Sequence, residues 1–394
     1  MYPNLYFLIE GLFGVKPPQL FSVVQSFGLF MAVSFICAGV VLVRDIKRRT
    51  ALGQFSPVIR DKVITGNPTP SDLIVNALIG FIVGFKLLYI AQNSSDFISN
   101  APDTLLSTKG SVIGGVIGAL LLAASKYWEK RQEAKKYNAT EKKTIKESVQ
   151  PQDYVGDILI VAAISGLIGA KLFAVIEYPA ELLKDPVGQL LSGSGLAIYG
   201  GLIGGFIGVL IFIRRLGFSP LHMMDTAAPA MLLGQGIGRI GCHLSGDGDW
   251  GIVNVNPKPF SWLPDSLWSL TYPHNVNGTG VLMPDCKGTF YTDNYCYELP
   301  EGVYPTSVYE IIMLVGLFAL LWFVFRHKFQ TPGVLFSWYL ILSSVERFLI
   351  EFIRVNDRYM FNLSQAQIIA VVLFLLGIVG IFYFRRREKN LQKV

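Results

Sequence analysis

Arg239 stands between glycines in the stretch GQGIGRIGCHLSGDGDWG, which covers residues 234–251 and ends an apolar run. The stretch continues with Cys242 and His243 and then with two aspartates. A charged side chain at membrane depth costs about 2.5–3.5 kcal/mol, so it indicates a functional residue by default. The many glycines predict a helix that breaks near Arg239 and exposes backbone N–H groups to a ligand.

A second group of ionisable side chains lies in SSVERFLIEFIRVNDR, residues 343–358. Intervals of four, three and four residues predict one helical face that carries Arg347, Glu351, Arg354 and Arg358. Arg347 and Glu351 can pair with each other, and Arg354 and Arg358 can extend to the membrane interface. A second buried arginine then has no spare carboxylate nearby in the sequence.

These arginines favour an anionic lipid as the ligand, because a guanidinium group is a planar fork of donors that fits a phosphate. Gly236, Gly238 and Gly241 spell G-x-G-x-x-G, but a dinucleotide site needs that motif between a strand and a helix. The sequence DGD at 247–249 lacks the spacing of an EF-hand loop. We therefore expect no metal ion and no cofactor.

The composition indicates a polytopic membrane protein. Of the 394 residues, 52% are hydrophobic and 16% are charged, with a mean hydropathy of +0.45, whereas soluble domains carry about 25% charged residues. Apolar runs long enough to cross a bilayer as helices predict an all-α fold with about nine spans, near 20–43, 73–92, 111–126, 155–175, 196–213, 226–245, 306–326, 332–354 and 364–384.

The loops give these spans an orientation. Lys and Arg concentrate after the odd-numbered spans, as in RDIKRR at 44–49 and RRREK at 385–389. Such loops stay in the cytoplasm, so the N-terminus is expected outside and the C-terminus inside. The formal net charge of +6 then reflects topology, and no nucleic-acid partner is expected.

The chain reads as one integral membrane domain, 1–394, with an internal repeat. Segment 72–126 resembles 157–213, because a lysine follows the opening aspartate by fourteen residues in both, and both then reach a Gly-Gly doublet. Segment 126–154 predicts a charged cytoplasmic helix or flexible loop, and 246–305 a small outward-facing head. In the head, Cys286 and Cys296 could form a disulfide or remain two free thiols.

Four blocks in the expected order make the sequence similar to the prolipoprotein diacylglyceryl transferases of the bacterial inner membrane. They are AIYGGLIGG, GQGIGRIGCHLSGDGDWG, YPTSVYE and ERFLIEFIR. The resemblance implies a core of seven membrane helices, so a nine-span chain would carry one extra hairpin. It also implies localisation in the inner (cytoplasmic) membrane as a multi-pass protein.

The resemblance implies transfer of the diacylglyceryl group of phosphatidylglycerol to the lipobox cysteine thiol of a prolipoprotein signal peptide, which forms a thioether and releases glycerol phosphate. The implied partners are therefore phosphatidylglycerol, the prolipoprotein and the lipid bilayer. Arg239 and Arg347 would clamp the phosphodiester and stabilise the charge that grows on it. The matching blocks add the implied substrate-binding residues Gly200, Gly201, Gln235, Asp247, Trp250, Gly251, Tyr309, Glu310 and Arg354.

The identity of the general base stays open. Relatives often carry a histidine before the Gly-Gly doublet, where this chain has Tyr199, and a tyrosine with a pKa near 10 is a poor base unless its surroundings tune it. His243 or Glu351 could serve instead. Asparagine is also common in relatives where Cys242 stands.

Two other functions fit the residues alone. A transporter or flippase for an anionic lipid would move the head group without breaking a bond. A membrane scaffold would use the arginines only to pair with carboxylates.

Overall fold

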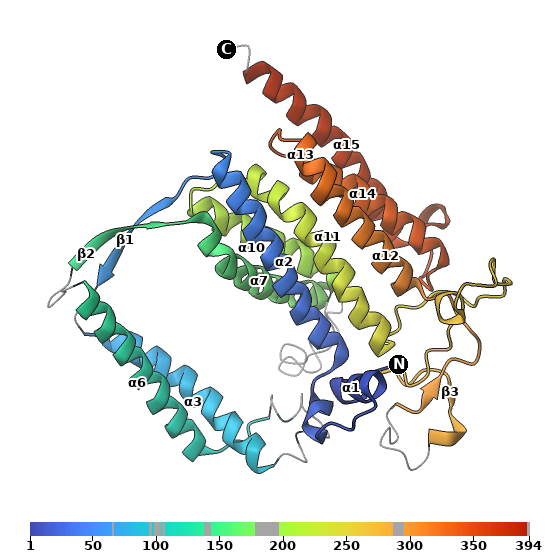
Figure 1. Ribbon diagram of the computed structural model, residues 1–394, viewed down its shortest axis with the longest axis horizontal. Helices are drawn as coiled ribbons and strands as arrows, with labels where there is room; N and C mark the ends of the chain where they lie inside the picture. Colours follow the sequence, from blue (N-terminus) through green and yellow to red (C-terminus); the bar gives the residue numbers. More distant parts are fainter. Residues whose placement is uncertain are drawn as a thin grey trace. The chain divides into compact units, whose positions relative to one another are not determined.

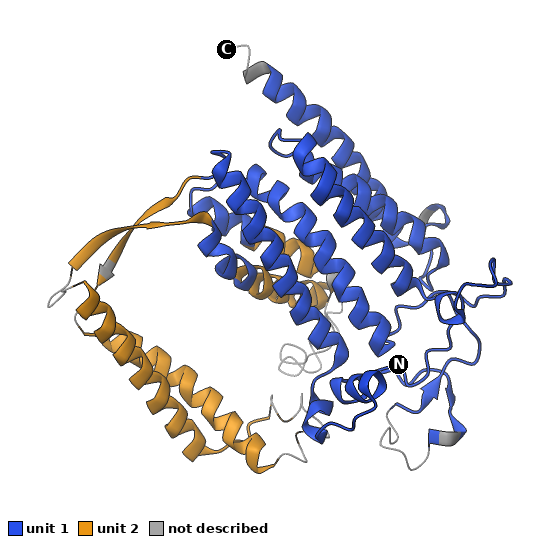
Figure 2. Ribbon diagram, in the orientation of Figure 1, with its two compact units in different colours: residues 1–55, 152–160, 209–394 blue, residues 56–151, 161–208 orange. Residues whose placement is uncertain are grey.

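The computed structural model describes residues 1–64, 67–93, 97, 104, 107–137, 143–177, 197–286 and 295–391. These residues are mostly helical and form two compact units (Figure 2). Unit 1 contains Met1–Phe55, Gln152–Ile160 and Val209–Val394, and unit 2 contains Ser56–Pro151 and Val161–Gly208. Parts of four predicted segments lie outside the described residues: 94–96, 98–103 and 105–106 in the first hairpin, 138–142, 178–196 and 287–294.

Six helical stretches of the described chain are long and apolar enough to cross a membrane. They are α2 (Ser26–Ala51), α3 (Pro70–Gln92), α6 (Val112–Lys136), α7 (Val155–Glu177), α12 (Thr306–Ala319) and α15 (Gln365–Leu391). The α12 helix continues through a π-helix, Leu320–Phe325, into α13 (Arg326–Lys328). Three more predicted spans are also helical: α10 (Ile198–Arg215), α11 (Pro220–Ser245) and α14 (Val334–Ile350).

The first predicted span begins too early. The N-terminal region forms α1 (Leu5–Phe13) and a 3₁₀ helix, Gln19–Val23, before α2 starts at Ser26. Gln25 is extended and interrupts the helical run, although the apolar composition continues across it.

In unit 1, α2 packs against α11, α11 against α12 and α14, and α14 against α15 (Figure 1). Glycines allow the close approach: a Cβ atom on Gly241 would come within 3.1 Å of Phe27, and one on Gly236 within 3.4 Å of Leu314. The core between α11, α12 and α14 contains Ala228, Leu232, Leu314, Leu321, Leu335 and Tyr339.

Asp225 fixes α14 against α11. Its buried carboxylate accepts hydrogen bonds from the backbone N–H groups of Gly333 and Phe336, each at 2.8 Å. These N–H groups lie at the start of α14, where a helix leaves donors without internal partners. The contact sets the relative position of the two helices that carry Arg239 and Arg347.

Unit 2 contains the α3–α6 hairpin and a two-stranded ribbon (Figure 1). Strand β1 (Val58–Ile64) pairs antiparallel with β2 (Lys143–Val149), so Val58 lies opposite Val149. Lys62 of β1 pairs with Glu133 of α6 at 2.7 Å and with Glu147 of β2 at 3.7 Å. The ribbon therefore connects the two ends of the hairpin.

The two hairpins have close backbone contacts at equivalent positions. Cβ atoms built on Gly84 and Gly80 would collide with the carbonyls of Gly114 and Gly118. At the equivalent positions of α7 and α10, Gly169 lies against Gly200 and Ser165 lies against Gly204. Ser111 N–H donates to Phe85 at 2.9 Å, and its counterpart Ala197 N–H donates to Ala170 at 3.2 Å. The duplication of the hairpin remains a prediction.

The described part of the head segment, 246–286 and 295–305, has little regular structure. It contains the short strands β3 (Val281–Leu282) and β4 (Tyr297–Glu298) and the 3₁₀ turns Asp265–Leu267 and Pro284–Cys286. Cys286 and Cys296 form a disulfide, which decides between the two alternatives that the sequence left open. Tyr272, Leu299 and Val303 form a small buried core.

Two expectations need correction. The fold is not all-α, because β1–β2 and β3–β4 are paired strands. Segment 126–154 is not only a helix or a flexible loop either: α6 extends to Lys136, and β2 follows. The strand was hidden because its partner β1 lies far upstream, before the hairpin.

Candidate functional site

Arg239 lies on an uninterrupted helix. The α11 helix runs from Pro220 to Ser245 and ends at Gly246, which has a φ of 64° and donates to the Cys242 carbonyl at 3.0 Å. The prediction of a helix break near Arg239 was therefore wrong. The glycines of this segment serve close packing against α2 and α12 instead.

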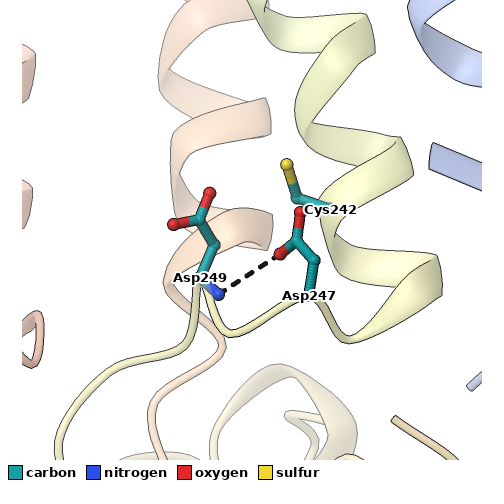
Figure 3. Close-up of side chains that lie close together, drawn as sticks. All are labelled: Cys242, Asp247 and Asp249. Atoms are coloured by element: carbon teal, nitrogen blue, oxygen red, sulfur yellow. Dashed lines mark hydrogen bonds between the residues drawn. The ribbon is translucent and has the colours of Figure 1, made fainter. Parts of the chain in front are cut away.

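The chain turns back sharply after α11. Gly246 and Gly248 both have positive φ values, 64° and 99°, which glycine adopts without steric cost. The Asp247 carboxylate accepts a hydrogen bond from the Asp249 N–H at 3.2 Å. This turn places the side chains of Cys242, Asp247 and Asp249 beside one another (Figure 3) and brings the Asp249 carboxylate into contact with Arg239.

One carboxylate joins the two key arginines. Glu310, in α12, lies 3.0 Å from Nε of Arg239 through Oε2 and 3.2 Å from NH1 of Arg347 through Oε1. Its side chain is 2% exposed, so the two guanidinium groups meet over a buried acid. The expectation that a second arginine lacks a spare carboxylate was therefore wrong, because α12 and the turn after α11 supply Glu310 and Asp249.

Arg354 and Glu351 complete the arginine network, which we define as Arg239, Arg347, Arg354, Asp249, Glu310 and Glu351. Arg354 contacts Asp249 directly and Glu310 at 3.5 Å, and Glu351 lies 3.3 Å from Arg347. The network is formally neutral when all six groups are ionised. Glu310 and Glu351 are 2% and 1% exposed and Arg354 is 9% exposed, whereas the side chains of Arg239, Arg347 and Asp249 are 24%, 31% and 28% exposed.

The exposure of these side chains determines what the network can bind. The buried carboxylates hold the guanidinium groups in place, and the accessible face presents N–H donors. Each guanidinium group has five donors, and the carboxylates engage only some of them. An anion with several acceptor oxygens is the complementary ligand.

The two aspartates of the turn have opposite electrostatic environments. Burial raises the pKa of Asp247 above its usual value, and the negative charge of Asp249 adds to this effect. Burial also acts to raise the pKa of Asp249, but the charges of Arg239 and Arg354 outweigh it and hold that pKa below its usual value. Asp249 is therefore the ionised partner of the arginines at neutral pH.

Cys242, Asp247 and Asp249 are also donors of the kind that bind metals, and their ligand atoms lie within 4.8 Å of one another. However, Arg239 and Arg354 each contact one oxygen of Asp249. The guanidinium groups thus supply the positive charge that a cation would bring. We assign these side chains to the arginine network.

Of the four charged residues predicted on one helical face, only Arg347 lies within α14. The helix gives way to a 3₁₀ turn, Glu351–Ile353, and Arg354 is extended, with φ −90° and ψ 153°. The prediction of one helical face for four residues was therefore wrong for Arg354 and Arg358. Arg354 instead forms a β-bridge with Gly251, and exposed Arg358 donates to the Asn362 carbonyl at 3.1 Å.

Gly251 allows this bridge by its lack of a side chain. A Cβ atom there would lie 2.5 Å from the Ile353 carbonyl and 2.9 Å from Thr306 and Tyr304. Any larger residue would push the chain away from Arg354.

The other predicted site residues of unit 1 surround the network. The His243 Nδ1 atom lies 3.3 Å from the Ser307 hydroxyl, and both the His243 and Trp250 rings pack on Tyr272. The Tyr309 hydroxyl donates to the Leu267 carbonyl at 2.9 Å, and Gln235 contacts the Tyr339 hydroxyl.

Tyr199, Gly200 and Gly201 lie on α10 in unit 2, whereas the arginine network belongs to unit 1. Gly200 packs against Gly169 and Phe173 of α7, and Gly201 lies near Ala170. Their predicted part in the site remains a prediction.

The sequence did not single out Asp249 or Glu346 for the site. Asp249 could be assigned to the site only from the turn that follows α11, and the glycines at 246 and 248 could have suggested that turn. Glu346 is buried on α14, and its Oε1 atom has no hydrogen-bond partner among the described residues. Its position in an apolar span, directly before Arg347, was a usable signal.

Comparison with known proteins identifies one family. The family described as prolipoprotein diacylglyceryl transferase matches residues 134–383. A phosphatidylglycerol–prolipoprotein diacylglyceryl transferase of Dehalococcoides mccartyi is 35% identical over 61% of this chain and 81% of its own length. The enzyme of the same name from Fusobacterium nucleatum is 33% identical over 63% and 88%, and that from Staphylococcus carnosus is 32% identical over 59% and 76%.

Proposed function

Because the chain belongs to the prolipoprotein diacylglyceryl transferase family, we infer that it is a membrane transferase that moves the diacylglyceryl group of phosphatidylglycerol to a prolipoprotein. The names of its relatives support both substrates. We further propose that the acceptor is the lipobox cysteine thiol of the signal peptide, that the product is a thioether, and that glycerol phosphate leaves.

The observation that carries the mechanism is the convergence of Arg239 and Arg347 on Glu310. Both guanidinium groups are partly exposed while the acid beneath them is buried. In our proposal they bind the phosphodiester of the lipid, and Asp249, itself paired with Arg354, holds Arg239 in place. As the carbon–oxygen bond breaks, negative charge grows on the phosphate, and donors that are already in place stabilise it without reorganising.

The acceptor thiol reacts as a thiolate, so its proton must be removed. Glu351 contacts Arg347 and accepts from the Asn356 amide at 2.5 Å, which favours a role in holding the arginines. Tyr199 and His243 are then our two candidate bases. A neutral imidazole is a competent base near pH 7, whereas a tyrosine needs a neighbouring positive charge.

We propose that all nine predicted spans cross the bacterial inner membrane, with the N-terminus outside. In that topology α11 and α14 end, and α12 begins, at the outer side. The arginine network lies at those three helix ends and would meet lipid head groups of the outer leaflet. We also propose that α3–α6 is an extra, duplicated copy of α7–α10. The family match begins at residue 134, near the end of α6.

The test is a transfer assay with purified protein, labelled phosphatidylglycerol and a lipobox peptide. We expect a thioether-linked diacylglyceryl peptide and free glycerol phosphate in equal amounts. A peptide with serine in place of the cysteine is the control and should remain unmodified. Intact lipid and unmodified cysteine peptide would contradict the proposal. The comparisons and the fold give no support to the transporter alternative.

A further inference from the structure

The segment that follows Asp249 is held between two other segments of the chain. Gly251 N–H donates to the Tyr304 carbonyl and Ile252 N–H to the Ile353 carbonyl, both at 2.9 Å. Asn254 N–H donates to the Gly302 carbonyl at 2.8 Å, and β-bridges join 251 to 354 and 253 to 303. Residues 251–254 are therefore fixed on both sides by backbone hydrogen bonds.

An open, mostly apolar cavity of about 200 Å³ lies on this segment. Two of its lining residues are buried: Leu299 and Val303 are 8% and 5% exposed and belong to the core around Tyr272. Glu301 is an acidic member of the lining. The apolar part is lined by Trp250, Gly251, Val253, Leu299, Val303 and Val355.

Two lining residues of the cavity adjoin residues of the arginine network along the chain. Trp250 directly follows Asp249, and Val355 directly follows Arg354. Asp249 and Arg354 form an ion pair, and Gly251 bridges to Arg354. One residue of extended chain spans about 3.3–3.6 Å. Trp250 and Val355 therefore lie about that far along the chain from Asp249 and Arg354.

We propose that this cavity, which we call the head pocket, binds an apolar side chain of the acceptor peptide, close in sequence to the reacting cysteine. The inference rests on the proposed function. An extended peptide places every second side chain on the same face. When the cysteine thiol of the acceptor peptide lies at the arginine network, a peptide side chain two or three residues away from the cysteine therefore lies at the head pocket.

The size and position of the head pocket favour a peptide side chain over lipid. Pockets for drug-sized ligands measure about 300–1,000 Å³, so this cavity fits one branched side chain and not a diacylglyceryl group. Its lining comes from the head and from the segment after α14, outside the described helices of the bundle. Apolar contacts in such a pocket discriminate about 10-fold or more per methylene group.

The test compares Val253→Lys with Val255→Lys in the full-length protein. Val253 lines the head pocket and is 42% exposed, whereas Val255 lies two residues further on and is 85% exposed. We expect Val253→Lys to raise the KM for the peptide about tenfold and to leave the KM for phosphatidylglycerol unchanged. Val255→Lys should behave like the wild type, and Val355→Lys, a second exposed lining position, should reproduce the Val253→Lys effect.

An alanine scan of the acceptor peptide within three residues of the cysteine locates the side chain. Alanine at one peptide position should weaken transfer by the wild-type enzyme. The same peptide should cause no further loss with the Val253→Lys variant, because that variant already lacks the contact between the peptide side chain and the head pocket. An increased KM for phosphatidylglycerol, or equal losses in both proteins at every position, would overturn the assignment. Absence of transfer by the wild type would instead refute the proposed function.

Discussion

At the residue scale, Arg239 does more than supply a positive charge. Its guanidinium group contacts Asp249 through NH1 and Glu310 through Nε, so one planar side chain joins the turn after α11 to α12. A lysine ammonium keeps the charge but cannot reproduce the two-sided fork. The geometry of the donors, as well as their charge, is therefore expected to matter for transfer.

We predict that Arg239→Ala and Arg347→Ala abolish transfer although the protein still inserts, and that Arg239→Lys loses at least about 100-fold. Losing one partner of a buried charge pair costs about 2–5 kcal/mol, and a tenfold change in rate is about 1.4 kcal/mol. Transfer rates and the amount of membrane-inserted protein are the measurements. Arg358→Ala changes an exposed arginine outside the network and is the control. Wild-type turnover by Arg239→Ala or Arg347→Ala would contradict the proposal that these two arginines bind the phosphodiester.

The two aspartates of the turn give a prediction about pH. The pKa of Asp247 is raised on folding, so its neutral form favours the native state, and that stability is lost as the pH rises through the folded pKa. The pKa of Asp249 is lowered, so its stabilising contribution is present above the unfolded value, near 3.9, and is lost as the pH falls.

Asp247→Asn should therefore raise the Tm at pH 7, and Asp249→Asn should lower it. Both differences from the wild type should shrink toward pH 3, where the unfolded carboxyl groups are mostly protonated. Asparagine can still accept the hydrogen bond that Asp247 accepts from the Asp249 N–H, so the turn is conserved. Thermal unfolding in detergent across this pH range measures both, and shifts of the same sign at pH 7 would contradict the assignment.

At the element scale, apolar runs predicted the helices because a span needs length and hydrophobicity, both of which are visible in a sequence. The ends of the helices depend on partners instead. Arg354 leaves α14 because the chain pairs there with Gly251, a residue far away in sequence. Likewise, charge at membrane depth revealed Arg239 and Arg347, whereas the contact of Asp249 with Arg239 depends on a turn that the sequence pattern did not reveal.

The equivalent glycines of the two hairpins give a matched pair of variants. Gly84 and Gly169 each leave room for a facing backbone carbonyl, so isoleucine at either position should force its hairpin apart. We predict that Gly169→Ile lowers transfer at least about tenfold, because α10 carries Tyr199. Gly84→Ile should leave transfer near the wild-type rate but make α3–α6 more sensitive to protease. Equal losses of transfer would mean that both hairpins serve the reaction.

At the scale of the whole molecule, the proposed extra hairpin α3–α6 would leave the arginine network uninterrupted. All six network residues follow α10 in the sequence. At the position equivalent to Tyr199, directly before the Gly-Gly doublet, the extra copy has Ile113. The hairpin α3–α6 thus has the packing glycines but not the candidate base, and we propose that it is a scaffold and not a second reaction centre.

The ribbon makes this conclusion testable by deletion. Val58 and Val149 are paired across β1 and β2, and paired strand residues lie about 4.5–5.5 Å apart. Replacing residues 59–148 with Asn-Gly, the preferred two-residue hairpin turn, should therefore reconnect the chain without strain. We expect the shortened protein to insert and to transfer within about tenfold of the full-length rate. The control deletion removes residues 161–208, with Tyr199 and Gly200, and should abolish transfer. If the shortened protein inserts but is as inactive as the control, α3–α6 contributes to the reaction and the scaffold interpretation is wrong.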